Sequence, residues 1–214
     1  MDQVDFINYL IEKNKYQSYL EIGLGSGENF LKVNCKNKEC VDPFNDFLDG
    51  DHSEDVRNWV IKNILTYRMT SDDFFASIDK DKKYDIIFID GFHEEEQVDR
   101  DILNSLKHLN PGGKIVLHDC IPASEKAQLP PEERQDGDWN GTTWKSIPKL
   151  ALMGVDFNVV NTDFGCGIVN YTPNVDKLVL PPRADYDYRQ VFSSMYIANI
   201  MLRVISVDTF KQIY

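Results

Sequence analysis

The sequence predicts an α/β protein built on a mostly parallel sheet of seven strands, with helices on both faces. Short apolar runs alternate with helical patterns from residue 18 to about residue 152, which is typical of βα units joined by right-handed crossovers. The run at 84–90 contains an unbroken Ile-Ile-Phe-Ile stretch, as expected of a strand covered on both faces. The last two apolar runs lie too close together for an intervening helix, so we expect an antiparallel hairpin at one edge.

The seven predicted strands are short apolar runs bounded by Gly, Pro, Asp or Asn. They lie at 18–23, 39–44, near the start of 67–78, and at 84–90, 114–118, 155–161 and 164–171. The predicted helices carry apolar residues at helical spacing or follow a capping residue. They lie at 5–13, 29–33, 53–65, from about residue 72, and at 94–109, 142–152 and 188–205. Pro111-Gly112-Gly113 ends the helix at 94–109. The polar, Pro-rich segment 121–141 predicts a long loop, either a lid or disordered.

The composition is that of a soluble globular protein, with 42% hydrophobic and 27% charged residues in 214. We expect one domain over 1–214, with a core at about 15–172 and a helical tail at about 183–214. The net charge of −12 makes nucleic acid and anionic membrane unexpected partners. The acidic N-terminus lacks the basic region of a signal peptide, and no apolar stretch is long enough to span a bilayer, so a cytoplasmic location is expected.

A glycine-rich turn, EIGLGSGENF, follows the first strand and contains Gly23, Gly25 and Gly27. Glycines at such a turn let the chain bend sharply and let a ligand approach the backbone closely. The dinucleotide fingerprint G-x-G-x-x-G fails, because Glu28 stands at its last position. Asp42 ends the second strand, where an acid can accept hydrogen bonds from ribose hydroxyls. A simple Asp-Pro turn is the alternative for Asp42.

Two further strands end in an acid and a histidine. The run at 84–90 ends in Asp90, followed three residues later by His93, and the run at 114–118 ends in His118 and Asp119. The carboxyl ends of parallel strands meet at one rim, where open α/β sheets bind ligands. Carboxylates and imidazoles there can hold a divalent metal or move a proton. Structural roles in the strand-to-helix turn remain open for Asp90 and His93.

These motifs resemble those of class I S-adenosylmethionine (SAM) dependent methyltransferases. EIGLGSG resembles the first motif of that superfamily, VDPF its ribose-binding acid, and LNPGGKIVLHD its turn into the fifth strand. IDGFHEEEQVDRDI and HDC resemble motifs of the macrocin and mycinamicin sugar O-methyltransferases. The resemblance spans roughly residues 15–170. It implies a Rossmann-like fold, SAM as cofactor, and methylation of a hydroxyl on a small-molecule or glycan acceptor.

The resemblance also implies roles for individual residues. Asp90 and Asp119 would bind a divalent metal such as Mg²⁺, and His93 would be the general base. His118 stands where some relatives have Glu, so we add it as a candidate metal ligand, although Mg²⁺ prefers oxygen ligands. Asp72 would lie beside the adenine, and a helix N-cap explains it equally well. The residues implied at the cofactor are Glu21, Gly23, Gly25, Gly27, Asp42, Asp72 and Asp90.

Other functions are weighed against this one. A metal-independent methyltransferase could use His93 or His118 as its base, and a non-catalytic module could bind SAM on the same fold. The failed fingerprint disfavours a nicotinamide oxidoreductase, and a metal-dependent hydrolase would need a fuller ligand set than four histidines provide. We expect acceptor specificity to lie in the 120–141 loop, the N-terminal helix and the tail. The apolar tail helix also suggests a homodimer contact.

Overall fold

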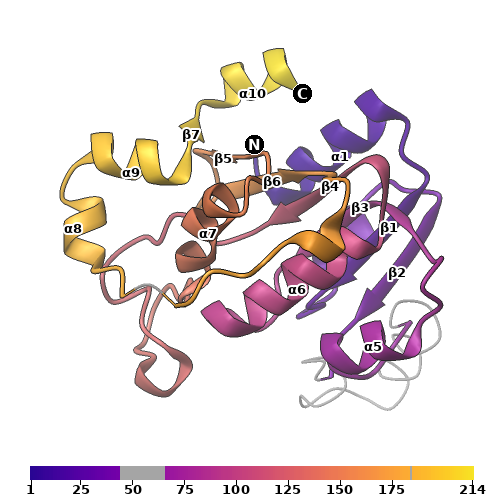
Figure 1. The fold of residues 1–214 in the computed structure, drawn as a ribbon, viewed down its shortest axis with the longest axis horizontal. Helices are drawn as coiled ribbons and strands as arrows, with labels where there is room; N and C mark the ends of the chain where they lie inside the picture. Colours follow the sequence, from indigo (N-terminus) through magenta and orange to yellow (C-terminus); the bar gives the residue numbers. More distant parts are fainter. Residues whose placement is uncertain (44–65, 184) are drawn as a thin grey trace.

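The computed structural model describes residues 1–43, 66–183 and 185–214. Within these residues a seven-stranded sheet has the order β2-β1-β3-β4-β6-β5-β7 (Figure 1). Strands β1 to β4 are parallel to one another, and β6 runs antiparallel between β4 and β5. The predicted mostly parallel sheet with an antiparallel hairpin is therefore confirmed. The strands are β1 Ser18–Ile22, β2 Asn37–Val41, β3 Tyr84–Ile89, β4 Leu109–Leu117, β5 Phe157–Val160, β6 Cys166–Asn170 and β7 Val204–Ile205.

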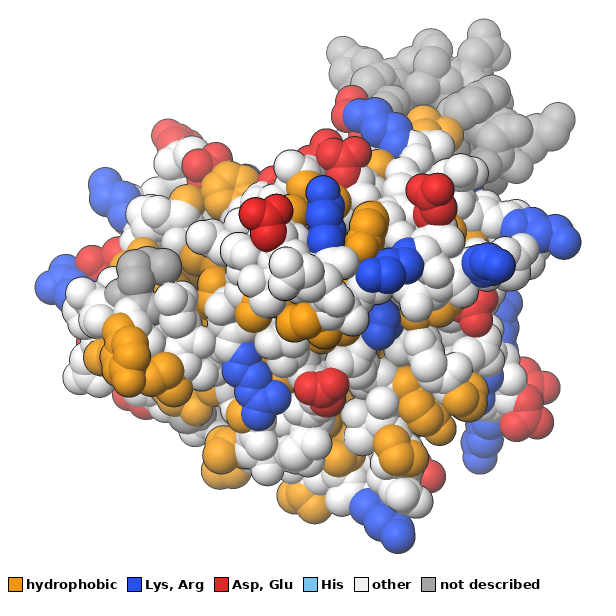
Figure 2. Space-filling view, turned by 90° about the horizontal axis from the view of Figure 1, so that it is seen from above, with side chains coloured by type: hydrophobic (Ala, Val, Ile, Leu, Met, Phe, Trp, Pro, Cys, Tyr) orange, Lys and Arg blue, Asp and Glu red, His pale blue; other side chains and the backbone are white. Residues whose placement is uncertain are grey.

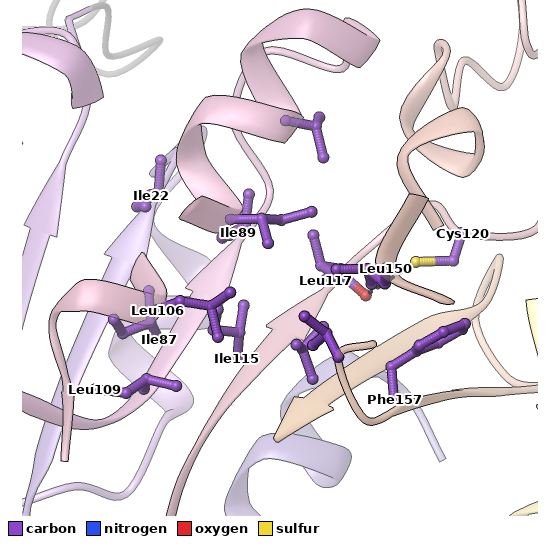
Figure 3. Packing of buried hydrophobic residues seen from close by; sticks show 14 of the residues in the cluster. Ile22, Ile87, Ile89, Leu106, Leu109, Ile115, Leu117, Cys120, Leu150 and Phe157 are labelled. Carbon is purple, nitrogen blue, oxygen red and sulfur yellow. Dashed lines mark hydrogen bonds between the residues drawn. The ribbon is translucent and has the colours of Figure 1, made fainter. Parts of the chain in front are cut away.

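Helices cover both faces of this sheet (Figure 1). Both faces need cover because successive residues of β3 point to opposite sides of the sheet and those from Ile86 to Ile89 are all apolar. Ile87 and Ile89 belong to one apolar cluster, whereas Ile86 and Phe88 belong to the other. Figure 3 shows the first cluster, in which the sheet packs against α6 and α7. The second cluster packs the other face against α1, α2 and α10. The helices are α1 Gln3–Asn14, α2 Glu28–Lys32, α5 Ser71–Ser77, α6 Glu95–Lys107, α7 Ile147–Leu152, α8 Tyr188–Phe192, α9 Met195–Leu202 and α10 Val207–Ile213.

Helix α6 forms as its sequence predicts. Val98, Ile102 and Leu106 are buried on one face, and the acidic first turn complements the helix dipole. Strand β4 begins earlier than predicted, at Leu109, and therefore includes the Pro-Gly-Gly segment. The pairing of β4 with β3 changes register at this segment. Gly113 is required there, because a Cβ would lie 2.8 Å from the carbonyl oxygen of Asp85.

Three other predicted elements differ from the observed ones. The strand expected near residue 67 is a single bridge between Val41 and Tyr67, so β7 from the tail is the seventh strand instead. The tail helix expected over 188–205 is broken, because the Ser194 side chain caps α9 and Arg203 ends it in the left-handed conformation. The helix expected at 142–152 divides into a 3₁₀ turn, η2 Thr143–Ser146, and α7, which has its proline in the first turn. The helix predicted at 53–65 lies outside the described residues.

Segment 121–141 forms a long loop, as predicted, with one 3₁₀ turn, η1 Pro131–Glu133. The loop folds back on itself, since the N–H groups of Asn140 and Gly141 both donate to the carbonyl oxygen of Ala127. Figure 2 shows a face of the molecule on which acidic, basic and apolar side chains are interspersed. Among the described residues, every helix is too short or too polar to span a bilayer.

Candidate functional site

The glycine turn connects β1 to α2 and packs against the residues that follow β3. Gly23 has φ +90, and a Cβ there would lie 2.2 Å from the carbonyl oxygen of Asp90, so only glycine permits this close approach. Gly25 has φ +49, and a Cβ there would meet nothing within 4 Å. Gly27 is the left-handed N-cap of α2. The three glycines therefore have separate roles: Gly23 allows packing, Gly25 borders open space and Gly27 starts the helix.

Asp42 braces this turn from the neighbouring strand. Its Oδ2 accepts hydrogen bonds from the N–H of Leu24 at 2.7 Å and of Gly25 at 3.3 Å. The residue directly follows β2 and is buried. An acid ending the second strand therefore holds the backbone of the glycine turn in place and lies beside the same space that Gly25 borders.

A cavity of about 410 Å³ opens at this rim, within the size range of small-molecule and cofactor sites. A second hollow of about 320 Å³ shares Gly23, Gly25 and Asp90 with it. The space next to Gly25 and the buried acid at Asp42 fit the nucleoside part of a cofactor such as SAM. The larger cavity is lined by Ile22, Gly23, Gly25, Val41, Asp42, Pro43, Thr70, Ser71, Asp90, Gly91, Phe92, Gln97 and Asp101.

Four polar residues of this lining, Thr70, Ser71, Gln97 and Asp101, were not predicted from the sequence, and three of them are joined by hydrogen bonds. The Gln97 amide donates to Ser71 Oγ and to Asp101 Oδ1, each at 3.1 Å. Burial is the main influence on Asp101 and raises the pKa of its carboxyl to about 6. The i, i+4 spacing of Gln97 and Asp101 places both on one side of α6. That spacing is visible in the sequence, but it does not reveal that this polar side of the helix faces a cavity.

Three predicted cofactor residues, Glu21, Gly27 and Asp72, are not among the residues that line this cavity. Asp72 pairs with Arg100 at 3.1 Å, and the helix N-cap at this position is Thr70, whose hydroxyl accepts from the N–H of Asp73. Glu21 lies inside β1 with 1% exposure and accepts a hydrogen bond from the Tyr19 hydroxyl. Burial, above all, raises the pKa of Glu21 to about 8. Glu21 therefore lies beneath the glycine turn, inside the sheet.

The two strand-end pairs meet in one cluster of four side chains. Asp90 Oδ1 lies 3.2 Å from His93 Nε2 and 3.4 Å from His118 Nδ1. Asp119 Oδ2 lies 3.1 Å from His93 Nδ1, and its Oδ1 lies 3.4 Å from His118 Nδ1. Each imidazole therefore contacts both carboxylates. The sequence predicted that these residues share a rim, and the structure brings all four together.

The charges in this cluster stabilise one another. Burial by itself would raise the pKa of Asp90, but hydrogen bonds from His118 and His93 outweigh it and hold the pKa of that carboxyl below its usual range. Burial by itself would lower the pKa of both imidazoles, but their hydrogen bonds and charge interactions with the two carboxylates outweigh it. The pKa of His93 is therefore raised, and that of His118 rises to about 11. Two imidazolium groups can thus balance the two carboxylates.

The donor set fits a divalent cation. One ligand atom each from Asp90, His93 and Asp119 lie within 4.8 Å of one another. His93 Nδ1 is buried without a hydrogen-bond partner, because its close contact with Asp119 lacks hydrogen-bond geometry. Two carboxylates and an imidazole suit several divalent metals. This group contains His93, whereas the sequence predicted His118 beside the two acids; His118 Nδ1 nevertheless faces both carboxylates.

Three more neighbours of the cluster come from loops and were not predicted as site residues. Asn140 donates from Nδ2 to Asp119 Oδ1 at 2.5 Å. The Trp139 ring stacks on His93, with centroids 5.1 Å apart and an interplanar angle of 17°. Asp163 lies 3.6 Å from His118 Nε2. No periodicity or motif marks these positions, because each is brought to the rim by the course of a loop.

Comparison with known proteins agrees with this fold. Residues 20–120 match the family model described as a methyltransferase domain. This stretch contains the glycine turn, Asp42 and the four-residue cluster. An O-methyltransferase from Bacillus cereus in complex with SAH superposes with a TM-score of 0.53 at 16% identity, over 79% of this chain and 80% of that one.

A second solved structure agrees with the first. An O-methyltransferase from Streptomyces achromogenes involved in tomaymycin synthesis, in complex with SAM, superposes with a TM-score of 0.54 at 14% identity, over 79% of each chain. The chain has a methyltransferase fold. No curated protein matches the sequence significantly. At 14–16% identity this likeness concerns the architecture of the chain.

Proposed function

We propose that this chain is a SAM-dependent methyltransferase that methylates a hydroxyl group of a small molecule or sugar with the help of a divalent metal. The observation that supports this most is the position of Asp90. It lines the candidate cofactor cavity and is also a member of the acid–imidazole cluster. A reactive methyl group in the cavity and a proton acceptor in the cluster would therefore be neighbours, as methyl transfer to an alcohol requires.

The residues of this chain would have the following roles. SAM, when bound, supplies an electrophilic methyl group on its sulfonium. Asp42 lies where it can receive ribose hydroxyls, and the Gly25 backbone leaves room for the ligand. The enzyme must then align the acceptor hydroxyl for an in-line displacement and take up its proton. These two tasks fall to the cluster beside the cavity.

In this proposal His93 takes up the proton of the acceptor hydroxyl, and Asp90, Asp119 and His118 bind the metal. His93 directly follows Gly91 and Phe92, which line the cavity. His118 Nδ1 lies 3.4 Å from an oxygen of each carboxylate, which supports His118 as their neighbour in the metal centre. When bound, a divalent ion would lower the pKa of the acceptor hydroxyl and offset the charge that keeps the proton on His93.

Calorimetric titration of SAM, with and without Mg²⁺, tests the cofactor. Gly25→Arg should abolish binding, because its side chain would fill the space that a Cβ at this position enters freely. Gly112→Arg is the matched control. Gly112 also has a positive φ and open space around its Cβ, and it lies in β4 away from the cavity lining. Absence of SAM binding to the unaltered protein under every condition would refute the proposal.

His93→Ala and His118→Ala separate the two imidazole roles. The His93 variant should turn over more slowly and bind the metal as tightly as the unaltered protein. The His118 variant should bind the metal more weakly. The reverse result would instead assign His93 to the metal, as the spacing of the group Asp90, His93 and Asp119 allows. Screening of acceptors from the sugar and small-molecule classes, with methyl-labelled SAM, tests the O-methylation itself.

A metal-independent methyltransferase is the second candidate. It is favoured by the contacts of the cluster, since an imidazole nitrogen already lies within 3.4 Å of each carboxylate. In that case imidazolium groups balance the carboxylates in place of a metal. Turnover that persists after EDTA treatment would support this second candidate over the first.

Two structural expectations accompany the proposed function. We propose that 1–214 forms one methyltransferase domain, because the tail strand β7 pairs with β5 of the same sheet. We also propose a homodimer through α9, which exposes large apolar side chains at Tyr196 and Ile200. Light scattering of the full chain and of a Tyr196→Ser, Ile200→Ser variant tests the second point, and a concentration-independent monomer contradicts it.

A further inference from the structure

A buried asparagine from the 121–141 loop reaches the candidate metal centre. Asn140 is 2% exposed, and its Nδ2 donates to Asp119 Oδ1 at 2.5 Å. Its Oδ1 accepts the N–H of Ala123 at 2.9 Å, and its own N–H donates to the carbonyl oxygen of Ala127 at 2.8 Å. These bonds determine which end of the amide faces Asp119, because the other end is occupied by a backbone donor.

The backbone of Asp119 is also held by its surroundings. It has φ +59, a left-handed conformation that is uncommon for a residue other than glycine and persists when its surroundings enforce it. The two residues that follow are held by backbone bonds, from the N–H of Cys120 to Gly165 and from the N–H of Ile121 to Phe164. With Oδ1 engaged by Asn140, Oδ2 is the oxygen that faces His93.

The loop is tied to the segment that carries His93 at the point where Asn140 lies. Gly141 has φ +60, and a Cβ there would lie 2.1 Å from the carbonyl oxygen of His93, so only glycine allows this approach. The N–H of Thr142 donates to that same carbonyl at 2.7 Å. The chain next to Asn140 is therefore fixed against the backbone of His93, and the Asn140 amide is bonded to the Asp119 carboxylate.

We propose that Asn140 is a positioning residue for the metal centre, which it serves by orienting the Asp119 carboxylate. This inference rests on the proposed function, because it assumes that Asp119 binds a divalent cation. A hydrogen bond to one carboxylate oxygen fixes the rotation of the carboxylate and so removes the cost of ordering this side chain when the ion binds. The 121–141 loop thereby becomes part of the centre rather than a cover beside it.

The test measures Mn²⁺ affinity by calorimetry and electron paramagnetic resonance in the unaltered protein and in Asn140→Ala. Loss of an outer partner of a metal ligand typically weakens binding about 10–100-fold, and that is the expected loss. Asn140→Leu is measured as well, because it keeps most of the buried volume if the smaller side chain destabilises the fold. SAM affinity should stay unchanged in both variants, since Asn140 does not line the cofactor cavity.

Asn110→Ala is the matched control. Asn110 donates from Nδ2 to Asp85 Oδ1 at 2.7 Å, which is the same kind of bond at the opposite end of β3 and β4. This variant loses an Asn–Asp pair of similar geometry, yet its Mn²⁺ affinity should equal that of the unaltered protein. A general effect of losing one such bond is thereby separated from an effect on the centre.

A failure of the positioning role and a failure of the proposed function give different results. If both Asn140 variants bind Mn²⁺ as tightly as the unaltered protein, the inference is overturned while the proposed function stands. If both lose SAM and Mn²⁺ binding together, Asn140 supports the fold in general and the inference is likewise overturned. If the unaltered protein itself binds no Mn²⁺, the metal part of the proposed function fails, and the positioning role fails with it.

Discussion

Replacing Glu21 by Gln should remove a large pH-dependent penalty from the stability of this protein. The Glu21 carboxyl is 1% exposed, and burial raises its pKa to about 8 from an ordinary value of 4.5. An acid with a raised folded-state pKa keeps its proton in the folded protein while the unfolded chain loses it. The unfolded state is therefore favoured increasingly as the pH rises from 4.5 to 8, and the penalty is constant above that range.

The size of the penalty follows from the two pKa values. Each unit corresponds to about 1.36 kcal/mol, so the difference between 4.5 and 8 amounts to about 5 kcal/mol above pH 8. At pH 6 the same relation gives about 2 kcal/mol. Below pH 4.5 Glu21 is protonated in both states, and the glutamine variant should differ from the unaltered protein by about 1 kcal/mol or less, since Gln can also accept the Tyr19 hydroxyl proton.

Urea unfolding at pH 4.5, 6, 7.5 and 9, at constant ionic strength, measures this effect. The quantity to follow is the difference in unfolding free energy between Glu21→Gln and the unaltered protein, because other titrating groups cancel in it. That difference should grow with pH and level off near pH 8. Parallel stability curves for the two proteins would refute the reasoning. If the Glu21→Gln variant also bound SAM more weakly than the unaltered protein, Glu21 would have a direct role at the cofactor.

Three further predictions concern other charges and the loop. Lys149→Met should destabilise the fold by about 3–5 kcal/mol in urea unfolding, because it removes the buried ammonium group that contacts both Glu95 and Asp99 on α6 and leaves Glu95 paired with the exposed Arg183. Lys32→Met, which breaks an exposed pair on α2, should cost about 0.5 kcal/mol or less. Mn²⁺ affinity should rise with pH, because a cation must displace the proton that His118 keeps up to its pKa of about 11, and a pH-independent affinity contradicts this. Trp139→Leu should lower the methylation rate without changing SAM affinity, because His93 loses the ring that orients it; an unchanged rate in a radiolabel assay counts against that role.

The features predictable from the sequence are those that depend on neighbours along the chain. The Ile-Ile-Phe-Ile run identified β3 as a strand covered on both faces, because burial on two sides removes the need for alternation. The glycine turn and the strand-end residues Asp90 and Asp119 followed from the rule that parallel strands end at a common rim. The broken tail helix was missed, since a left-handed residue at Arg203 and a strand pairing with β5 have no local signature.

What the sequence by itself determined is the mostly parallel sheet with its strands β1 to β6, and the residues at its carboxyl edge, because periodicity and turn chemistry act over a few residues. Only the tertiary structure decided which other groups reach that edge. Asn140 meets Asp119 across 21 positions of a loop without periodicity, and Gln97 meets Ser71 across 26. Such contacts depend on the path of the chain in space, because hydrogen bonds act over about 3 Å regardless of the separation along the sequence.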